Sequence, residues 1–138
     1  MKIYLDENTS PYLCRGLQEF QHSLNADRKD PVSIFSIREQ FGLGAADEEW
    51  IPKVGKENGL AITHDINITR TKHQRELCEK HGVGLIIIRP PSKKHGLPYW
   101  EQVQLLVKYW LDILKVATRK SGHYHYELKP KSGLKEMG

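Results

Sequence analysis

An acidic tripeptide, Asp6-Glu7-Asn8, is the sequence feature that most constrains the fold of this chain. It directly follows Lys2-Ile3-Tyr4-Leu5, a short run typical of a first β-strand, and it precedes Ser10-Pro11, which signals the start of a helix. Open α/β sheets place their ligand sites beyond the carboxyl ends of their strands. The tripeptide therefore predicts an α/β protein with a polar site at one edge of its sheet.

The following residues alternate between strand-like and helix-like patterns. Further strands are expected at residues 32–37, 60–63 and 84–88, and helices at 11–21, 47–57, 71–81 and 98–117. The run 84–88 is almost entirely apolar, which is typical of a parallel strand buried on both faces. Strands that alternate with helices predict a mainly parallel sheet, of four to five strands, flanked by helices and joined by right-handed crossovers.

The last part of the chain differs in composition. From Arg119 onward it is rich in lysine, and it contains a short pattern typical of an edge strand at residues 123–128. We therefore expect a main domain at residues 1–118 and a basic, partly disordered extension at residues 119–138. The sequence suggests no function for this extension.

Length and composition set the remaining limits. A chain of 138 residues predicts a single core, and no apolar run approaches the roughly 18 residues of a membrane span. No signal-peptide pattern is present, so a cytoplasmic location is expected. Cys14 and Cys78 lie far apart, each in an expected helix, which predicts two reduced thiols. The formal net charge of +4 suits a polyanionic partner beside an acidic site.

Acidic residues recur at three equivalent places in the expected fold. Asp6 follows the first strand, Asp47 and Glu48 open the helix after the second, and Asp65 follows the third. In a parallel sheet these junctions meet at one edge. Clustered carboxylate oxygens are ligands for Mg²⁺ or Mn²⁺, which activates water and neutralises charge on a phosphoryl oxygen. This pattern favours metal-assisted hydrolysis.

Each of these residues also has a structural interpretation. Asp47 is a reasonable helix N-cap, with Glu48 favoured by the helix dipole, and Asp65 is a reasonable turn residue. Asn8 suits either the start of the first helix or the orientation of a water molecule. Adjacent helix positions face different directions, so the sequence leaves open whether Asp47 or Glu48 faces inward.

Three motifs together resemble one family. Asp6-Glu7-Asn8 resembles its opening "DEN" box, residues 44–49 (GAADEE) its "GxSDEE" helix start, and residues 60–65 (LAITHD) its third acidic box. This is the PIN-like domain family, small relatives of VapC-type toxin nucleases, and the resemblance covers about residues 1–90. It implies a single Rossmann-like domain in which Asp6, Asp47 and Asp65 hold Mg²⁺ or Mn²⁺.

The same resemblance implies a function and partners. PIN-type proteins act on single-stranded RNA and commonly dimerise, so it implies a ribonuclease and homodimer. It also implies the toxin half of a type II toxin–antitoxin pair, with an antitoxin protein as partner. The helix with Trp100 and Trp110 is a candidate antitoxin contact, although its apolar stripe is more typical of a core helix.

The chain departs from the family pattern at three positions. Asn67 and Ile68 replace the second acid and the Phe of the third box, and Ala46 stands where Ser is common. Asn67 can offer a carbonyl oxygen to a metal but no charge, and Glu48 is a further candidate ligand. The sequence therefore leaves two interpretations open: a metal-dependent endoribonuclease, or a non-catalytic RNA- or protein-binding module on a degenerate PIN fold.

Basic residues follow the third and fourth expected strands. The candidates for contact with nucleic acid are Asn8, Arg70, Lys72, Arg75, Lys93 and Lys94. A solvated helix face explains the basic residues of 70–75 equally well. His64 adjoins Asp65 and is a further candidate for assisting a proton transfer.

A phospho-acceptor receiver domain is a third interpretation, with Mg²⁺ at Asp6-Glu7 and Asp65 as the acceptor. Such domains need five βα units and a lysine that closes a late strand. The expected strand 84–88 ends instead in Arg89-Pro90, which disfavours this interpretation.

Overall fold

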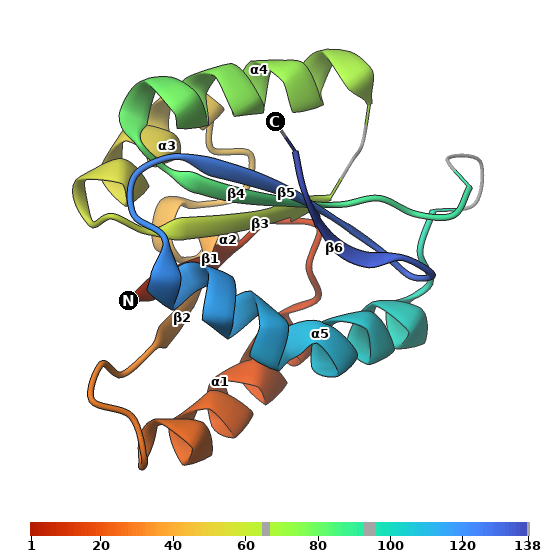
Figure 1. The fold of residues 1–138 in the computed structure, drawn as a ribbon. Coiled ribbons are helices and arrows are strands. Elements are labelled where there is room, and N and C mark those ends of the chain that lie inside the picture. The colour runs from red at the N-terminus through yellow and green to blue at the C-terminus, as the bar shows by residue number, and fades with distance from the viewer. Residues whose placement is uncertain (65–66, 93–95, 138) are drawn as a thin grey trace.

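The computed structural model describes residues 1–64, 67–92 and 96–137, which form a layered α/β domain (Figure 1). Its sheet has the strand order β2-β1-β3-β4-β5-β6. The strands are β1 Lys2–Leu5, β2 Ser33–Ser36, β3 Leu60–His64, β4 Gly84–Ile88, β5 Tyr124–Lys129 and β6 Gly133–Glu136. The helices are α1 Pro11–Asn25, α2 Ile37–Phe41, α3 Asp47–Lys56, α4 Ile68–His81 and α5 Tyr99–Arg119.

The first five strands pair in parallel, and β6 pairs with β5 in the antiparallel sense. This confirms the predicted α/β class and mainly parallel sheet, but the strand count exceeds the expected four to five. The expected edge strand at 123–128 is β5, whereas β6 takes the edge position. The segment beyond residue 118, which we expected to be partly disordered, therefore supplies two strands of the same sheet.

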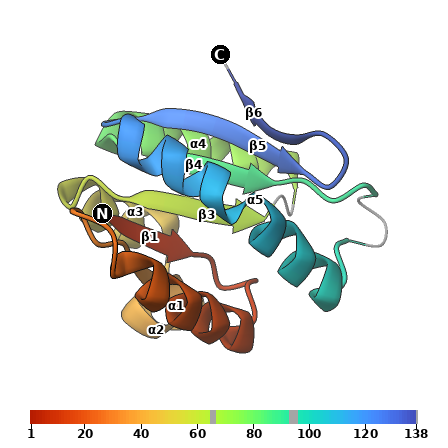
Figure 2. The same ribbon diagram turned by 60° about the horizontal axis from the view of Figure 1, so that its bottom comes forward.

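Helices cover both faces of the sheet, with α1 and α5 on one side and α3 and α4 on the other (Figures 1 and 2). Alternate strand residues fill the two cores. Ile3, Leu5 and Ile62 pack on the side of α1 and α5, while Tyr4 and Ile87 pack on the side of α3 and α4. The β4 residues 84–88 are all buried, as predicted for a strand covered on both faces.

The helices α1 and α5 lie side by side and share one buried hydrogen bond (Figure 2). Nε1 of Trp110 donates to Oε1 of Gln21 at 2.8 Å. The predicted apolar stripe of α5 is only partly a core face, because Val107 and Leu111 are exposed. On α1, likewise, Phe20 is exposed rather than buried.

Local capping explains where the helices begin and end. Ser10 caps α1 through its side chain, and Asn67 caps α4, which therefore begins at Ile68 rather than at Thr71 as expected. Gly82 ends α4 with φ +70°, a left-handed conformation that glycine adopts without strain. The short helix α2 was not predicted.

Among the described residues, no helix combines the length and apolarity needed to cross a bilayer.

Candidate active site

The strand order reverses between β1 and β3, because the chain passes from β1 outward to β2 and then returns to β3 on the other side of β1. Open α/β sheets form a ligand crevice at such a reversal, beyond the carboxyl ends of the strands. Asp6 directly follows β1 at this point. Its backbone N–H donates to the carbonyl oxygen of Ile62 at 3.1 Å, which ties it to β3.

The carboxylate of Asp6 is buried and accepts three hydrogen bonds. The backbone N–H of His64 donates to Oδ2 at 2.7 Å. Nδ1 of His64 and the hydroxyl of Thr9 lie 2.9 and 3.1 Å from Oδ1. Burial alone would raise the pKa of the Asp6 carboxyl, but the hydrogen bonds and charge of His64, together with Thr9, hold it below its ordinary value. Asp6 is therefore a carboxylate at neutral pH.

His64 ends β3 and faces Asp6 through Nδ1. Its other ring nitrogen, Nε2, is buried and has no hydrogen-bond partner among the described residues. Nδ1 donates to the Asp6 carboxylate, so Nε2 is the ring nitrogen that remains for a further partner. His64 was a secondary candidate in the sequence, and the structure joins it to Asp6 directly.

Asp47 is the first residue of α3 and faces inward, whereas Glu48 is exposed. Oδ1 of Asp47 accepts hydrogen bonds from Nε1 of Trp50 at 3.1 Å and from Nε2 of Gln74 at 3.3 Å. Glu48 instead pairs with Nε2 of His73 on α4. Asp47 is not the N-cap, since Ala46 occupies that position without a side-chain hydrogen bond. The structure thus favours Asp47 over Glu48 as the inward acid.

Glu7 connects the end of β1 to the starts of both α3 and α4. Its Oε2 accepts a hydrogen bond from the N–H of Gly44 at 2.9 Å, just before α3. Nη2 of Arg70, in the first turn of α4, lies 3.6 Å from Glu7 Oε1. These contacts join the first acidic motif to the second, and the Asp6–His64 contact joins it to the described part of the third.

The remaining predicted residues have varied surroundings. The side-chain oxygen of Asn67 accepts a hydrogen bond from the N–H of Arg70 at 2.8 Å, so it serves as the cap of α4. Asn8 and Lys72 are exposed, and Arg75 lines a cavity that also involves β5. The predicted residues Asp65, Lys93 and Lys94 lie outside the described residues.

The donor chemistry at this edge suits a hard divalent cation. A carboxylate has about four lone-pair positions, so Asp6 keeps one beyond its three hydrogen bonds, and Oδ2 of Asp47 accepts none within the described chain. Within residues 1–64, 67–92 and 96–137, no group of three or more His, Cys, Asp or Glu side chains is arranged to hold a metal ion. The expected third acid, Asp65, is outside those ranges.

Comparison with known proteins identifies a family for this chain. A family model for the PIN-like domain matches residues 1–90. The chain belongs to the PIN-like domain family. The match runs from β1 to just past β4 and covers all three acidic motifs, whereas the candidates Lys93 and Lys94 lie beyond it. No curated protein and no solved structure matches the chain.

The PIN-like match also bears on the receiver-domain interpretation. The sheet has five parallel strands, and the fifth, β5, ends at Lys129, so a lysine does close a late strand. Nζ of Lys129 lies 3.8 Å from Oε2 of Glu127 on its own strand. It is the family match, rather than a missing lysine, that separates this PIN-like chain from a receiver domain.

Proposed function

We propose that this PIN-like protein is a metal-dependent endoribonuclease that hydrolyses RNA phosphodiester bonds at the edge carrying Asp6 and Asp47. One observation carries the proposal: a buried carboxylate at the strand-order reversal is kept ionised by hydrogen bonds from His64 and Thr9. A charge held at the crevice of an α/β sheet, without a cationic Lys or Arg against it in the described structure, suits a cation ligand.

Asp6 and Asp47 would hold Mg²⁺ or Mn²⁺, and the family resemblance adds Asp65. When bound, the ion would acidify a water molecule and offset charge on a phosphoryl oxygen. The role of the chain is to position the ligands before the ion arrives. His64 and Thr9 fix the Asp6 carboxylate, while Trp50 and Gln74 leave Oδ2 of Asp47 available.

Arg70 and Lys72 support RNA as the substrate. Both lie in the first turns of α4, whose N-terminus is next to the acidic edge through the Arg70–Glu7 contact. Cationic side chains and the positive end of a helix dipole both attract phosphates. RNA binding through these residues should therefore weaken steeply as salt is added.

A protein partner remains part of the proposal. The exposed apolar residues of α1 and α5 border a groove of about 350 Å³ lined by Leu17, Phe20, Ser23, Leu24, Val107, Trp110 and Leu111. Such a surface supports the expected antitoxin segment, and a second copy of the chain is the competing occupant. The toxin role, the homodimer and the cytoplasmic location stay predictions.

The alternative is a non-catalytic RNA- or protein-binding module on the same fold. Asn67 favours it, because the family's acid is replaced there and its side-chain oxygen already caps α4. The two functions differ in one result: the module binds RNA without breaking it.

The test is cleavage of a 5′-labelled single-stranded RNA with Mn²⁺, comparing wild type with Asp6→Asn. Asp112→Asn is the matched control, since Asp112 is exposed on α5. The nuclease account expects cleavage by wild type and the control, and its loss in Asp6→Asn. RNA binding by all three proteins without cleavage at any metal concentration would instead support the binding module.

A further inference from the structure

A second, larger cavity lies away from the candidate active site. It has a volume of about 910 Å³ and opens between α4, the loop from α5 to β5, and the end of β6. On β5 it involves Tyr124 and His125, which pair with Gly84 and Leu85 at the beginning of β4. Asp6, in contrast, follows the carboxyl end of its strand. The two sites therefore lie toward opposite ends of the sheet.

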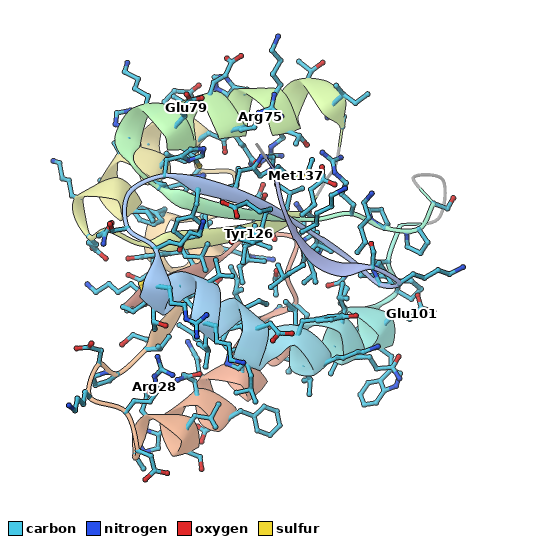
Figure 3. The ribbon with its side chains drawn as sticks, viewed as in Figure 1. Arg28, Arg75, Glu79, Glu101, Tyr126 and Met137 are labelled. Atoms are coloured by element: carbon cyan, nitrogen blue, oxygen red, sulfur yellow. The ribbon has the colours of Figure 1, made fainter. Side chains whose placement is uncertain are left out.

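The cavity carries more positive than negative side chains. Arg75, Arg119 and Lys120 line it, against Glu79 and Glu136. Figure 3 shows Arg75 and Glu79 on α4. The backbone N–H of Met137, just after β6, donates to the carbonyl oxygen of His125 on β5 at 2.8 Å. Nζ of Lys120 is already paired with Oε1 of Glu136 at 2.6 Å.

Two arginines of the cavity have no carboxylate partner among the described residues. Arg75 and Arg119 are exposed, and neither forms an ion pair or hydrogen bond with the described residues. A guanidinium presents a planar set of donors that matches phosphate oxygens in a bidentate manner. Free guanidinium groups at a cavity wall are therefore suited to a phosphate.

His125 supplies an independent sign of a ligand. Its side chain is only 6% exposed, and its Nε2 has no hydrogen-bond partner in the part of the chain that the structure describes. A buried polar nitrogen without a partner is costly, so a ligand that supplies one would stabilise this site. Burial and the nearby charge of Arg75 lower the pKa of His125, although Glu127 opposes this, so the ring is neutral and able to donate one N–H.

His123 shows that the histidines of this wall are held in place. Its Nδ1 lies 2.8 Å from the carbonyl oxygen of Val83, which can only accept, so Nδ1 donates. His123 directly precedes β5, and both histidines line the cavity. The wall thus offers two oriented imidazoles beside the two arginines.

We propose that this cavity binds a small phosphorylated ligand of nucleotide size, with its phosphate held by Arg75 and Arg119 and by an N–H of His125. The volume is within the range of small-molecule sites, roughly 300–1,000 Å³. The site is independent of the proposed nuclease activity. It also gives Arg75 a partner other than an RNA strand at the acidic edge.

The test is calorimetric titration of the whole chain with adenosine 5′-monophosphate, inorganic phosphate and adenosine, in buffer with EDTA so that no metal contributes. We expect the monophosphate to bind and adenosine to bind at least tenfold more weakly. Arg75→Gln should weaken the monophosphate at least tenfold. Arg28→Gln is the matched control, because Arg28 lies on the far side of the molecule (Figure 3).

Nitrogen-15 NMR of the imidazoles gives a second readout that does not depend on substitution. The monophosphate should shift the ring signals of His125 and leave those of His22 unchanged. Absence of binding by both the monophosphate and phosphate would overturn the proposal. So would adenosine binding as tightly as its monophosphate, or equal monophosphate affinity in Arg75→Gln and Arg28→Gln.

Discussion

The Asp6 carboxylate is held by His64 on both of its oxygens: the backbone N–H of His64 donates to Oδ2 at 2.7 Å, and Nδ1 lies 2.9 Å from Oδ1. This contact joins the ends of β1 and β3, the two strands between which the strand order reverses. It fixes the orientation of the carboxylate. A site prepared in this way loses little conformational entropy when it binds.

Replacing Asn67 with Asp should change the Mn²⁺ affinity of the site while leaving the stability of the fold nearly unchanged. Asp and Asn are comparable N-caps, so Asn67→Asp should keep the cap of α4 and change the unfolding free energy by less than about 0.5 kcal/mol. The added carboxylate should tighten Mn²⁺ binding about tenfold, or roughly 1.4 kcal/mol.

Calorimetry and urea unfolding of Asn67→Asp measure these two quantities. Unchanged Mn²⁺ affinity in a stable variant would show that position 67 is not a ligand. Asn67→Ser, a cap without a carboxylate, is the control that should leave metal affinity near that of wild type.

Ala46→Ser should stabilise the protein. Ala46 is the N-cap of α3, with φ −69° and ψ 146°, and it makes no side-chain hydrogen bond there. A serine hydroxyl can accept from a free N–H of the first turn, which adds about 1 kcal/mol. Urea unfolding measures the gain, with Ala45→Ser, one residue before the cap, as the control. Equal stability of the two variants would contradict the capping argument.

The substitution of glycine by alanine should lower the stability of the protein at one position and raise it at another. A Cβ on Gly84 would lie 2.3 Å from Cζ of the buried Tyr124 ring, so Gly84→Ala should cost about 1–3 kcal/mol. A Cβ on Gly16, inside α1, would meet nothing within 4 Å, so Gly16→Ala should add about 0.5–1 kcal/mol. Thermal unfolding checks both signs, and a stabilising Gly84→Ala would show that Tyr124 does not pack on β4.

Both cysteines should be inert in the folded protein. Burial, aided by Glu39, raises the pKa of Cys14 to about 11, and burial, aided by Asp47, raises that of Cys78 to about 12. At pH 8, below both values, the thiols stay protonated and therefore weakly nucleophilic. A disulfide reagent should label neither cysteine at pH 8 until urea is added, and then both. Rapid labelling of the native protein would contradict this burial.

The sequence was enough to locate the acidic motifs because each depends on a local junction. Asp6 follows an apolar run and Asp47 opens a helix, and both patterns are readable without knowledge of distant contacts. The parallel sheet was predicted from the alternation of strand-like and helix-like runs along the chain. The α/β class and the mainly parallel sheet are confirmed, and both depend on patterns that a short stretch of sequence contains.

The partners of these acids were harder to predict because they are distant in the sequence. Gln74 reaches Asp47 across 27 positions, and the His64 ring reaches Asp6 across 58. On α5 the apolar pattern extends beyond the buried face, so periodicity alone did not tell the exposed Val107 and Leu111 from the buried Trp110. The strand β6 has too few apolar residues to give a signal.

The most direct test of the central claim is calorimetric titration of Mn²⁺ into wild type, Asp6→Asn and the surface control Asp112→Asn. Because the ionised Asp6 is the proposed metal ligand, wild type and the control should bind Mn²⁺ alike. Asp6→Asn should lose most of that affinity while unfolding at a similar urea concentration. Equal Mn²⁺ affinity in a folded Asp6→Asn protein, or no binding by wild type, would contradict a metal-dependent site at this edge of the sheet.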